Sequence, residues 1–152
     1  MKTIKFPIIF LLLILSNFLN AQKLDSWKKV DEMHEKKWQF LVDQSQLSPK
    51  EVELVKPIFM QYEKTVWKQH AKDREFFKAA RNIKNNVKPN YAELNDRYAD
   101  VELIQGQQFK NYHLKLRKVL SPESLFKFYK AERDFKRKLL QDFPSHGDHS
   151  ER

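Results

Sequence analysis

The C-terminal tail carries the residue types of a metal site, because His146, Asp148 and His149 fall within one run of four residues. Imidazole nitrogens and a carboxylate oxygen are ligands that zinc and copper accept. A preorganised site also needs a rigid backbone and supporting hydrogen bonds. The segment 142–152 reads as a disordered tail. We therefore expect no cofactor, with zinc or copper at this tail as the alternative.

The other histidines are weaker candidates for metal ligands. His70 and Asp73 are three residues apart, which places both on one face of a helix and could supply two metal ligands. A hydrogen bond at the surface is the simpler interpretation. His34 and His113 fall on or beside apolar stripes, so we expect them in the core or at its edge.

Catalytic chemistry finds little support in the residue types. The chain has no cysteine, which excludes thiol catalysis and disulfides, and it has no glycine-rich phosphate loop or nucleophile elbow. Its carboxylates alternate with lysine and arginine, as ion pairs on helix surfaces do. No two of them share an apolar setting that would raise one pKa. The sequence therefore predicts a protein that is not an enzyme.

Basic residues dominate the segment 64–88, where eight lysines and arginines face only Asp73 and Glu75. A surface of this kind attracts acidic partners over long distances, and nearby aromatic side chains can then hold them. The alternative is an ordinary solvated helix surface. The aromatic candidates lie off the apolar stripes, where a dimer contact or a wider core is an equal alternative. The predicted client-binding residues are Lys64, Trp67, Lys68, Lys72, Phe76, Lys78, Arg81, Phe126, Tyr129 and Lys130.

Helices must position these residues, because only two glycines are available for tight turns. Apolar residues recur every three or four positions in four segments, 26–43, 49–85, 91–118 and 122–141. We expect Pro57 to kink the long second helix. Gln69, His70 and Asp73 interrupt its stripe, so the middle of that helix is expected to face solvent. Predicted core aromatics are Trp27, Trp38, Phe59, Tyr62, Tyr98, Phe109, Tyr112, Phe128 and Phe135.

Two of these helices begin with nearly the same letters, LSPKE at 47–51 and LSPES at 120–124. In each, serine fits the N-cap, proline fits the first helical position, and the preceding leucine can pack on the fourth residue. The first copy also completes a capping box with a glutamate, whereas Ser124 takes that place in the second. Asn90 and Glu93 form a weaker start. The cap residues are Leu47, Ser48, Pro49, Glu51, Leu120, Ser121 and Pro122.

The N-terminus reads as a secretory signal peptide over residues 1–21. Lys2 and Lys5 precede an apolar run too short to span a membrane, and Ala21 fits a cleavage site. The signal holds two of the 29 basic and none of the 20 acidic residues, so its removal lowers the formal charge from +9 to +7. We expect an exported protein with one helical domain over 22–141 and anionic membrane surfaces or acidic unfolded chains as partners, not nucleic acid.

The chain resembles the Spy/CpxP family, small periplasmic stress proteins with two copies of a Leu-Thr-x-x-Gln motif. The copies here are the segments 47–51 and 120–124, with serine in each threonine position and Glu51 and Ser124 in place of glutamine. The segments 55–62 and 128–135 also resemble related small helical proteins that are linked as sensors to extracytoplasmic-function sigma factors. The resemblance covers residues 45–141.

The resemblance implies an all-α, elongated four-helix hairpin fold, commonly a cradle-like antiparallel homodimer. It also implies a periplasmic chaperone that binds unfolded or aggregation-prone proteins without ATP. Two alternatives remain: a regulator that docks on one membrane-bound stress sensor, and a metal-responsive protein that uses the histidine tail.

Overall fold

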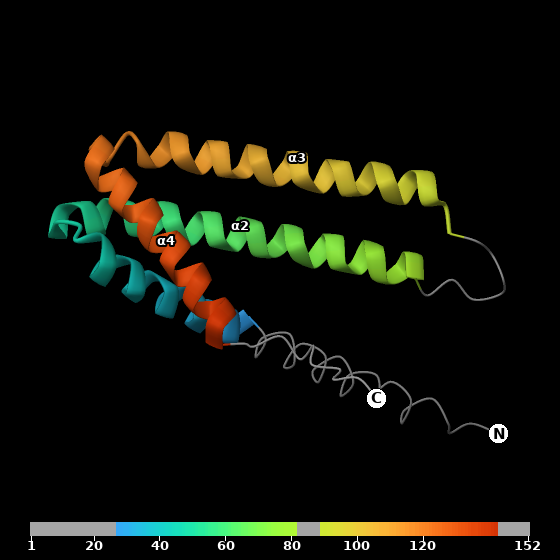
Figure 1. Ribbon diagram of the computed structural model, residues 1–152, viewed down its shortest axis with the longest axis horizontal. Coiled ribbons are helices and arrows are strands. Elements are labelled where there is room, and N and C mark those ends of the chain that lie inside the picture. Colours follow the sequence, from blue (N-terminus) through green and yellow to red (C-terminus); the bar gives the residue numbers. More distant parts are fainter. Residues whose placement is uncertain (1–26, 82–88, 143–152) are drawn as a thin grey trace, which may run out of the picture. The chain divides into compact units, whose positions relative to one another are not determined.

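A computed structural model describes residues 27–81 and 89–142 of the chain. The described residues form a helix at 27–45, α2 (Pro49–Arg81), α3 (Tyr91–Leu116) and α4 (Pro122–Asp142), with no strand among them (Figure 1). The all-α prediction is therefore confirmed for this part of the chain. The predicted signal peptide at 1–21 and the tail beyond 142 lie outside the described residues.

The helix boundaries follow the caps read from the sequence. The starts at Pro49, Tyr91 and Pro122 are confirmed. The third helix ends at Leu116, two residues before the predicted end, and three turn residues follow it. The second helix continues without a break across Pro57, so the missing N–H of the proline ring does not end it.

The capping box at the start of α2 is complete. The Ser48 backbone N–H donates to Glu51 Oε2 at 2.9 Å, and the Glu51 N–H donates to Ser48 Oγ at 3.3 Å. Just before it, Gln46 has a φ of 55°, the left-handed conformation that commonly ends a helix. These two features turn the chain from the helix at 27–45 into α2.

The other two starts use the same local chemistry. At α4, the Ser124 N–H donates to Ser121 Oγ at 3.1 Å, and the Ser121 hydroxyl donates to Ser124 Oγ at 3.0 Å. At α3, the Glu93 N–H donates to Asn90 Oδ1 at 3.3 Å. The bonds from the Ser124 and Glu93 backbone each satisfy an N–H that the helix itself leaves without a partner.

The chain divides into two compact units, one ending at Lys37 and one beginning at Trp38. In the first unit, the described residues 27–37 are part of the helix at 27–45, and Val30 and His34 are buried. The second unit holds the hydrophobic core, in which Trp38 lies 5.3 Å from Phe59 and 6.4 Å from Phe128 between ring centroids. The core residues are Trp38, Leu41, Val55, Phe59, Tyr112, Leu116, Leu120, Leu125, Phe128 and Ala131.

The core lies where α2 begins, α3 ends and α4 begins, and both leucine-led caps contribute to it. Leu120 and Leu125 are core residues, and Leu47 and Val52 pack against them or their neighbours. The Ser124 side chain also helps to hold the pKa of Glu51 below its ordinary value. The two copies of the motif therefore meet at one end of the unit, where both helix starts bury their leucines together.

Along the rest of its length α2 packs antiparallel to α3 (Figure 1). The rings of Tyr62 and Tyr112 stack at 4.0 Å with 3° between their planes, and Phe77 stacks on Tyr98 at 4.4 Å. Next to the second stack, Arg97, the neighbour of Tyr98, forms an ion pair with Asp73. We call this line of contacts the α2–α3 seam.

The expectation that the middle of α2 faces solvent is wrong for two of its three residues. Asp73 is 5% exposed and Gln69 is half-buried, whereas His70 is exposed. Gln69 lies seven residues after Tyr62, and Asp73 lies seven residues after Val66. Seven residues are about two helical turns, so both positions continue the apolar stripe. They enter the seam because α3 supplies a polar partner, the Arg97 guanidinium.

Two predicted core aromatics are exposed rather than buried. Tyr98 is 62% and Phe109 46% exposed, whereas Trp38, Phe59, Tyr112 and Phe128 are buried as predicted. Tyr98 rests on the Phe77 ring of α2, and Phe109 touches the Tyr129 ring of α4 at 5.7 Å. A stripe buries its residues only where other helices cover it, and one neighbouring ring leaves much of each side chain in solvent. Trp27, Tyr62 and Phe135 are half-buried.

Candidate binding surfaces

The predicted lysines lie on the surface of α2. Lys64, Lys68, Lys72 and Lys78 are all exposed, and the first three follow one another at four-residue spacing. Exposed ammonium groups in such a row attract anionic partners at a range set by salt screening. Lys130 is exposed on α4. The side chain of Arg81 lies outside the described residues.

The two aromatic candidates of α2 are less available than their lysine neighbours. Trp67 is half-buried, and the Arg74 guanidinium lies 5.8 Å from its ring centroid. Phe76 is half-buried, with the Arg97 guanidinium 5.6 Å from its ring centroid and the centroid of the T-shaped neighbour Phe77 at 5.3 Å. The rings of Trp67 and Phe76 can therefore each contact a binding partner through only one face or edge.

The aromatic candidates of α4 differ from each other. Phe126 is 63% exposed, and Lys130 lies four residues later on the same face of the helix. Tyr129 is half-buried, and its hydroxyl lies 3.0 Å from His113 Nδ1. Burial, followed by the charge of Glu132, raises the pKa of Tyr129 to about 12. Phe126 is thus the open side chain, and Tyr129 belongs to a packed cluster with α3.

The candidate residues fall into two groups rather than one patch. The first group follows α2 from Lys64 to Lys78, toward the end of the α2–α3 seam where Phe77 meets Tyr98. The second lies on α4, which meets α3 near His113. Sequence spacing alone does not separate them, because it does not say where α4 crosses the other helices.

Acidic residues accompany the basic end of α2. Glu93, Asp96, Asp100 and Glu102 are exposed on α3, on either side of Tyr98. Since Tyr98 stacks on Phe77, this acidic stretch lies beside the basic end of α2. The two charges partly compensate each other there.

Sequence reasoning also missed several exposed apolar side chains. Leu103 is 72%, Leu114 39% and Leu140 66% exposed. Leu103 and Leu114 are eleven residues apart, three helical turns, so they lie on one side of α3. That side is opposite Tyr112, which faces α2. A helical wheel of α3 would have found them, because neither fits the stripe that includes Leu94 and Tyr112.

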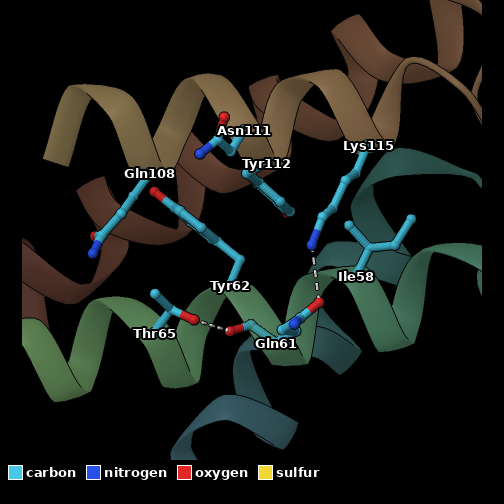
Figure 2. A pocket seen from close by; sticks show the side chains of 8 residues that line it. All are labelled: Ile58, Gln61, Tyr62, Thr65, Gln108, Asn111, Tyr112 and Lys115. Atoms are coloured by element: carbon cyan, nitrogen blue, oxygen red, sulfur yellow. Dashed lines mark hydrogen bonds between the residues drawn. The ribbon is translucent and has the colours of Figure 1, made fainter. Parts of the chain in front are cut away.

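A pocket of about 170 Å³ opens on the α2–α3 seam (Figure 2). Gln108 and Lys115 point from α3 toward α2, with Tyr62 between them. The Lys115 ammonium donates to Gln61 Oε1 at 3.0 Å, and the Thr65 hydroxyl donates to the Gln61 backbone carbonyl at 2.8 Å. Eight residues line the pocket: Ile58, Gln61, Tyr62, Thr65, Gln108, Asn111, Tyr112 and Lys115.

The two tyrosines that line this pocket, Tyr62 and Tyr112, interact with nearby carboxylates. Burial, followed by the charges of Glu132 and Glu63, raises the pKa of Tyr62 to about 12 and holds the pKa of Tyr112 well above its ordinary value. The Tyr112 hydroxyl donates to Glu132 Oε1 at 3.4 Å. The hydroxyl groups of Tyr62 and Tyr112 therefore stay neutral at physiological pH, with the carboxylates of Glu132 and Glu63 near them.

No cluster of potential metal ligands occurs in the described part of the chain. Residues 27–81 and 89–142 contain no group of three or more histidine, aspartate or glutamate side chains placed to hold an ion. Asp73 pairs with Arg97 rather than with His70. The predicted ligands His146, Asp148 and His149 lie outside the described residues. Within the described ranges, no helix has the length and apolarity needed to cross a bilayer.

Comparison with known protein families, curated proteins and solved structures finds no match for this chain. The geometry of the described surfaces therefore carries the functional argument.

Proposed function

We propose that this chain is an exported, ATP-independent holding protein that binds unfolded or aggregation-prone proteins in the periplasm. The observation that carries the proposal is the pairing of exposed apolar and cationic side chains on the same helix faces. Phe126 is 63% exposed, with exposed Lys130 one turn away on α4. Binding of this kind needs neither a cofactor nor a catalytic group.

The mechanism has two steps. Exposed lysines such as Lys64 and Lys68 first attract an acidic segment of the client, an interaction that salt screens within about 10 Å at 0.1 M. Exposed apolar side chains such as Phe126 and Leu103 then make small, exchangeable contacts. Individually weak contacts allow the client to leave and refold.

The proposed arrangement is an elongated four-helix hairpin that forms a cradle-like antiparallel homodimer. The antiparallel packing of α2 on α3 and the apolar side chains exposed along α3 support it. Exposed apolar surface of this extent favours association with a second chain or with a client.

Light scattering tests the proposal directly. A chemically unfolded acidic protein is diluted into buffer with residues 22–152, without nucleotide, at low and high salt. We expect suppression of aggregation at near-stoichiometric ratios that weakens as salt rises. Matched variants Lys64→Gln with Lys68→Gln, compared with Lys110→Gln on α3, locate the charged surface. Unchanged aggregation at every ratio would exclude the holding function.

The alternative is a regulator that docks on one membrane-bound stress sensor. The acidic stretch of α3 beside the basic end of α2 favours it, because mixed charges in a fixed pattern suit one partner better than many. Such a protein binds its partner in an envelope-membrane pull-down and leaves client aggregation unchanged.

If a metal regulates the chain instead, truncation after Phe143 removes metal binding and spares the holding of clients.

A further inference from the structure

The side of α4 opposite the core carries a row of exposed side chains. Leu125, Phe128 and Ala131 belong to the core, so the other side of this helix is turned to solvent. Positions that alternate by four and three residues on that side form one stripe, because a helical turn takes 3.6 residues. We call this row the α4 stripe; its members are Phe126, Lys130, Arg133, Arg137 and Leu140.

Large apolar side chains stand at both ends of the α4 stripe. Phe126 is 63% and Leu140 66% exposed. Their positions in the sequence place them about 21 Å apart along the helix axis, at 1.5 Å per residue. Apolar surface left in water forfeits the free energy that burial would give it. A good partner for α4 therefore covers this whole length and accepts an apolar group at each end.

The middle of the α4 stripe is cationic. Lys130 and Arg133 form no ion pair with any residue that the structure describes. Arg137 pairs with Asp134 beside the stripe, yet the Arg137 side chain stays 69% exposed. Since the stripe itself contains no acidic residue, its charge is complementary to an anionic surface.

Charges beside the stripe have the same net sign. The acidic residues between Phe126 and Leu140 are Glu132 and Asp134, and both are half-buried. Lys136 is exposed next to them. Nearer the start of the helix, Lys127 is paired with Glu123 at 2.7 Å, so the flanking charges there cancel. The cationic character of this surface therefore increases toward the C-terminal half of α4.

A phospholipid bilayer with anionic headgroups matches this pattern. Its phosphates extend in every direction, so a row of cations meets them without any need for a matching sequence. Guanidinium groups such as those of Arg133 and Arg137 bond two phosphate oxygens at once. The boundary between headgroups and acyl chains accepts exposed phenylalanine and leucine side chains. An unfolded acidic chain, in contrast, must present its charges and two apolar groups at one fixed spacing.

We propose that the α4 stripe docks on the surface of an anionic phospholipid bilayer, with its cations on the phosphates and its two apolar ends at the boundary with the acyl chains. The inference goes beyond the holding of clients, because it gives the protein a place at a membrane. Phe126 and Lys130 also belong to the predicted client-binding residues, so lipid and client compete for α4. Arg133, Arg137 and Leu140 do not, and they can test the membrane contact separately.

Vesicle co-sedimentation tests the proposal on the chain of residues 22–152. The apolar N-terminal segment is left out because it would bind lipid by itself. One set of vesicles contains phosphatidylcholine alone, and the other contains phosphatidylcholine mixed with phosphatidylglycerol. Polyglutamate, an acidic chain without lipid, is the third probe, and its affinity is measured by calorimetry.

Two double variants remove the same amount of charge from different places. Arg133→Gln with Arg137→Gln removes two cations of the α4 stripe, and Lys50→Gln with Lys110→Gln removes two exposed cations elsewhere. Leu140→Gln removes one apolar end. Circular dichroism verifies that each variant is folded. Suppression of client aggregation is measured in parallel.

We expect binding to the anionic vesicles and none to phosphatidylcholine alone. The α4 double variant should bind at least about tenfold more weakly, since each cation near an anionic bilayer is worth about fivefold in affinity. The control pair should lose less than about threefold, because its cations lie away from the contact. Leu140→Gln should weaken binding roughly fivefold through the lost apolar contact.

Absence of binding to the anionic vesicles overturns the proposal, as does an equal loss in the two double variants, which would make net charge the whole cause. Polyglutamate binding that is as tight as vesicle binding, and is lost in the same variant, assigns the stripe to acidic chains instead. Failure to bind vesicles while clients are still held overturns the membrane contact alone. Failure in both assays overturns the holding function as well.

Discussion

Asp73 of α2 and Arg97 of α3 form an ion pair within the seam of the two helices. Asp73 is 5% exposed, and Gln69 also donates to its two carboxylate oxygens at 3.1 and 3.3 Å. The Arg97 side chain is 26% exposed and lies over the ring of Phe76. A buried carboxylate is tolerated here because two donor groups, the Gln69 amide and the Arg97 guanidinium, make three hydrogen bonds to it, which favours one register of the α2–α3 contact.

Replacement of Arg97 by methionine should lower the free energy of unfolding by about 3 kcal/mol, because Asp73 is left buried without a cation. Urea unfolding followed by circular dichroism measures the loss. The double variant Asp73→Leu with Arg97→Met should recover most of it, since neither charge then remains in the seam. Equal stability of the single and double variants would contradict this account. Lys110→Met on the exposed side of α3 is the control.

The capping box at the start of α2 should make the free energy of unfolding depend on pH in the acidic range. The Ser48 backbone N–H, then the hydroxyls of Ser124 and Ser48, hold the pKa of Glu51 below its ordinary value. A carboxyl with a lowered folded-state pKa stabilises the protein above its unfolded pKa, near 4.5, and the gain is lost as pH falls through the folded pKa. Glu51→Gln should be less stable than the unsubstituted chain at neutral pH, with the gap closing in acid. A gap that is constant with pH would refute it.

The serine caps themselves should each contribute about 1 kcal/mol. Ser48→Ala and Ser121→Ala each remove the side-chain oxygen that accepts an N–H at the third helical residue. Chemical unfolding of both variants and of their combination measures the effect. Because Ser124 links the two caps through Glu51, the combined loss should differ from the sum of the single losses. Strict additivity would show that the two caps act independently.

The tyrosine cluster should make the protein sensitive to alkali. Burial, with the charges of nearby glutamates, raises the folded-state pKa of Tyr62 and of Tyr129 to about 12. A phenol whose folded pKa is raised stabilises the protein below its unfolded pKa of about 10, and this is lost as pH rises toward 12. Phenolate absorbance and unfolding free energy, measured across that range, should change together. Tyr62→Phe should lose less stability there, and an equal loss would contradict the assignment.

Two phenylalanines of α4 should separate folding from binding. Phe128 is fully buried in the core, so Phe128→Ala should cost about 3–5 kcal/mol. Phe126 is 63% exposed, so Phe126→Ala should change stability by less than about 0.5 kcal/mol. Under the proposed function, Phe126→Ala still weakens suppression of client aggregation. Full suppression by this folded variant would remove α4 from the client-binding surface.

Local signals made the helix starts predictable. Ser48, Asn90 and Ser121 each bond to an N–H three residues away, and such bonds depend only on neighbouring residues. The apolar stripe of α2 likewise led to Val55, Phe59 and Tyr62. The local pattern does not report what a second helix brings opposite a residue. For this reason Asp73 was expected in solvent, although Arg97 draws it into the seam.

The binding surfaces were less predictable because they depend on how helices meet. Tyr98 and Phe109 have the same spacing as the buried Tyr112, yet they lie on parts of α3 that are less fully covered. The pocket was missed altogether. Its glutamine, asparagine and threonine residues carry no distinctive chemistry, and half of them come from a helix about fifty residues away in the chain.

The contact between Trp38 and Phe128 has a consequence for how the chain is made. These rings stand near the two ends of the described chain, so the core remains incomplete until the ribosome has synthesised α4. The chain must close a long loop before its largest side chains can meet, which slows the last step of folding. Under the proposed export, a core that stays incomplete until α4 is made would leave the emerging chain open enough to be threaded through a translocation channel.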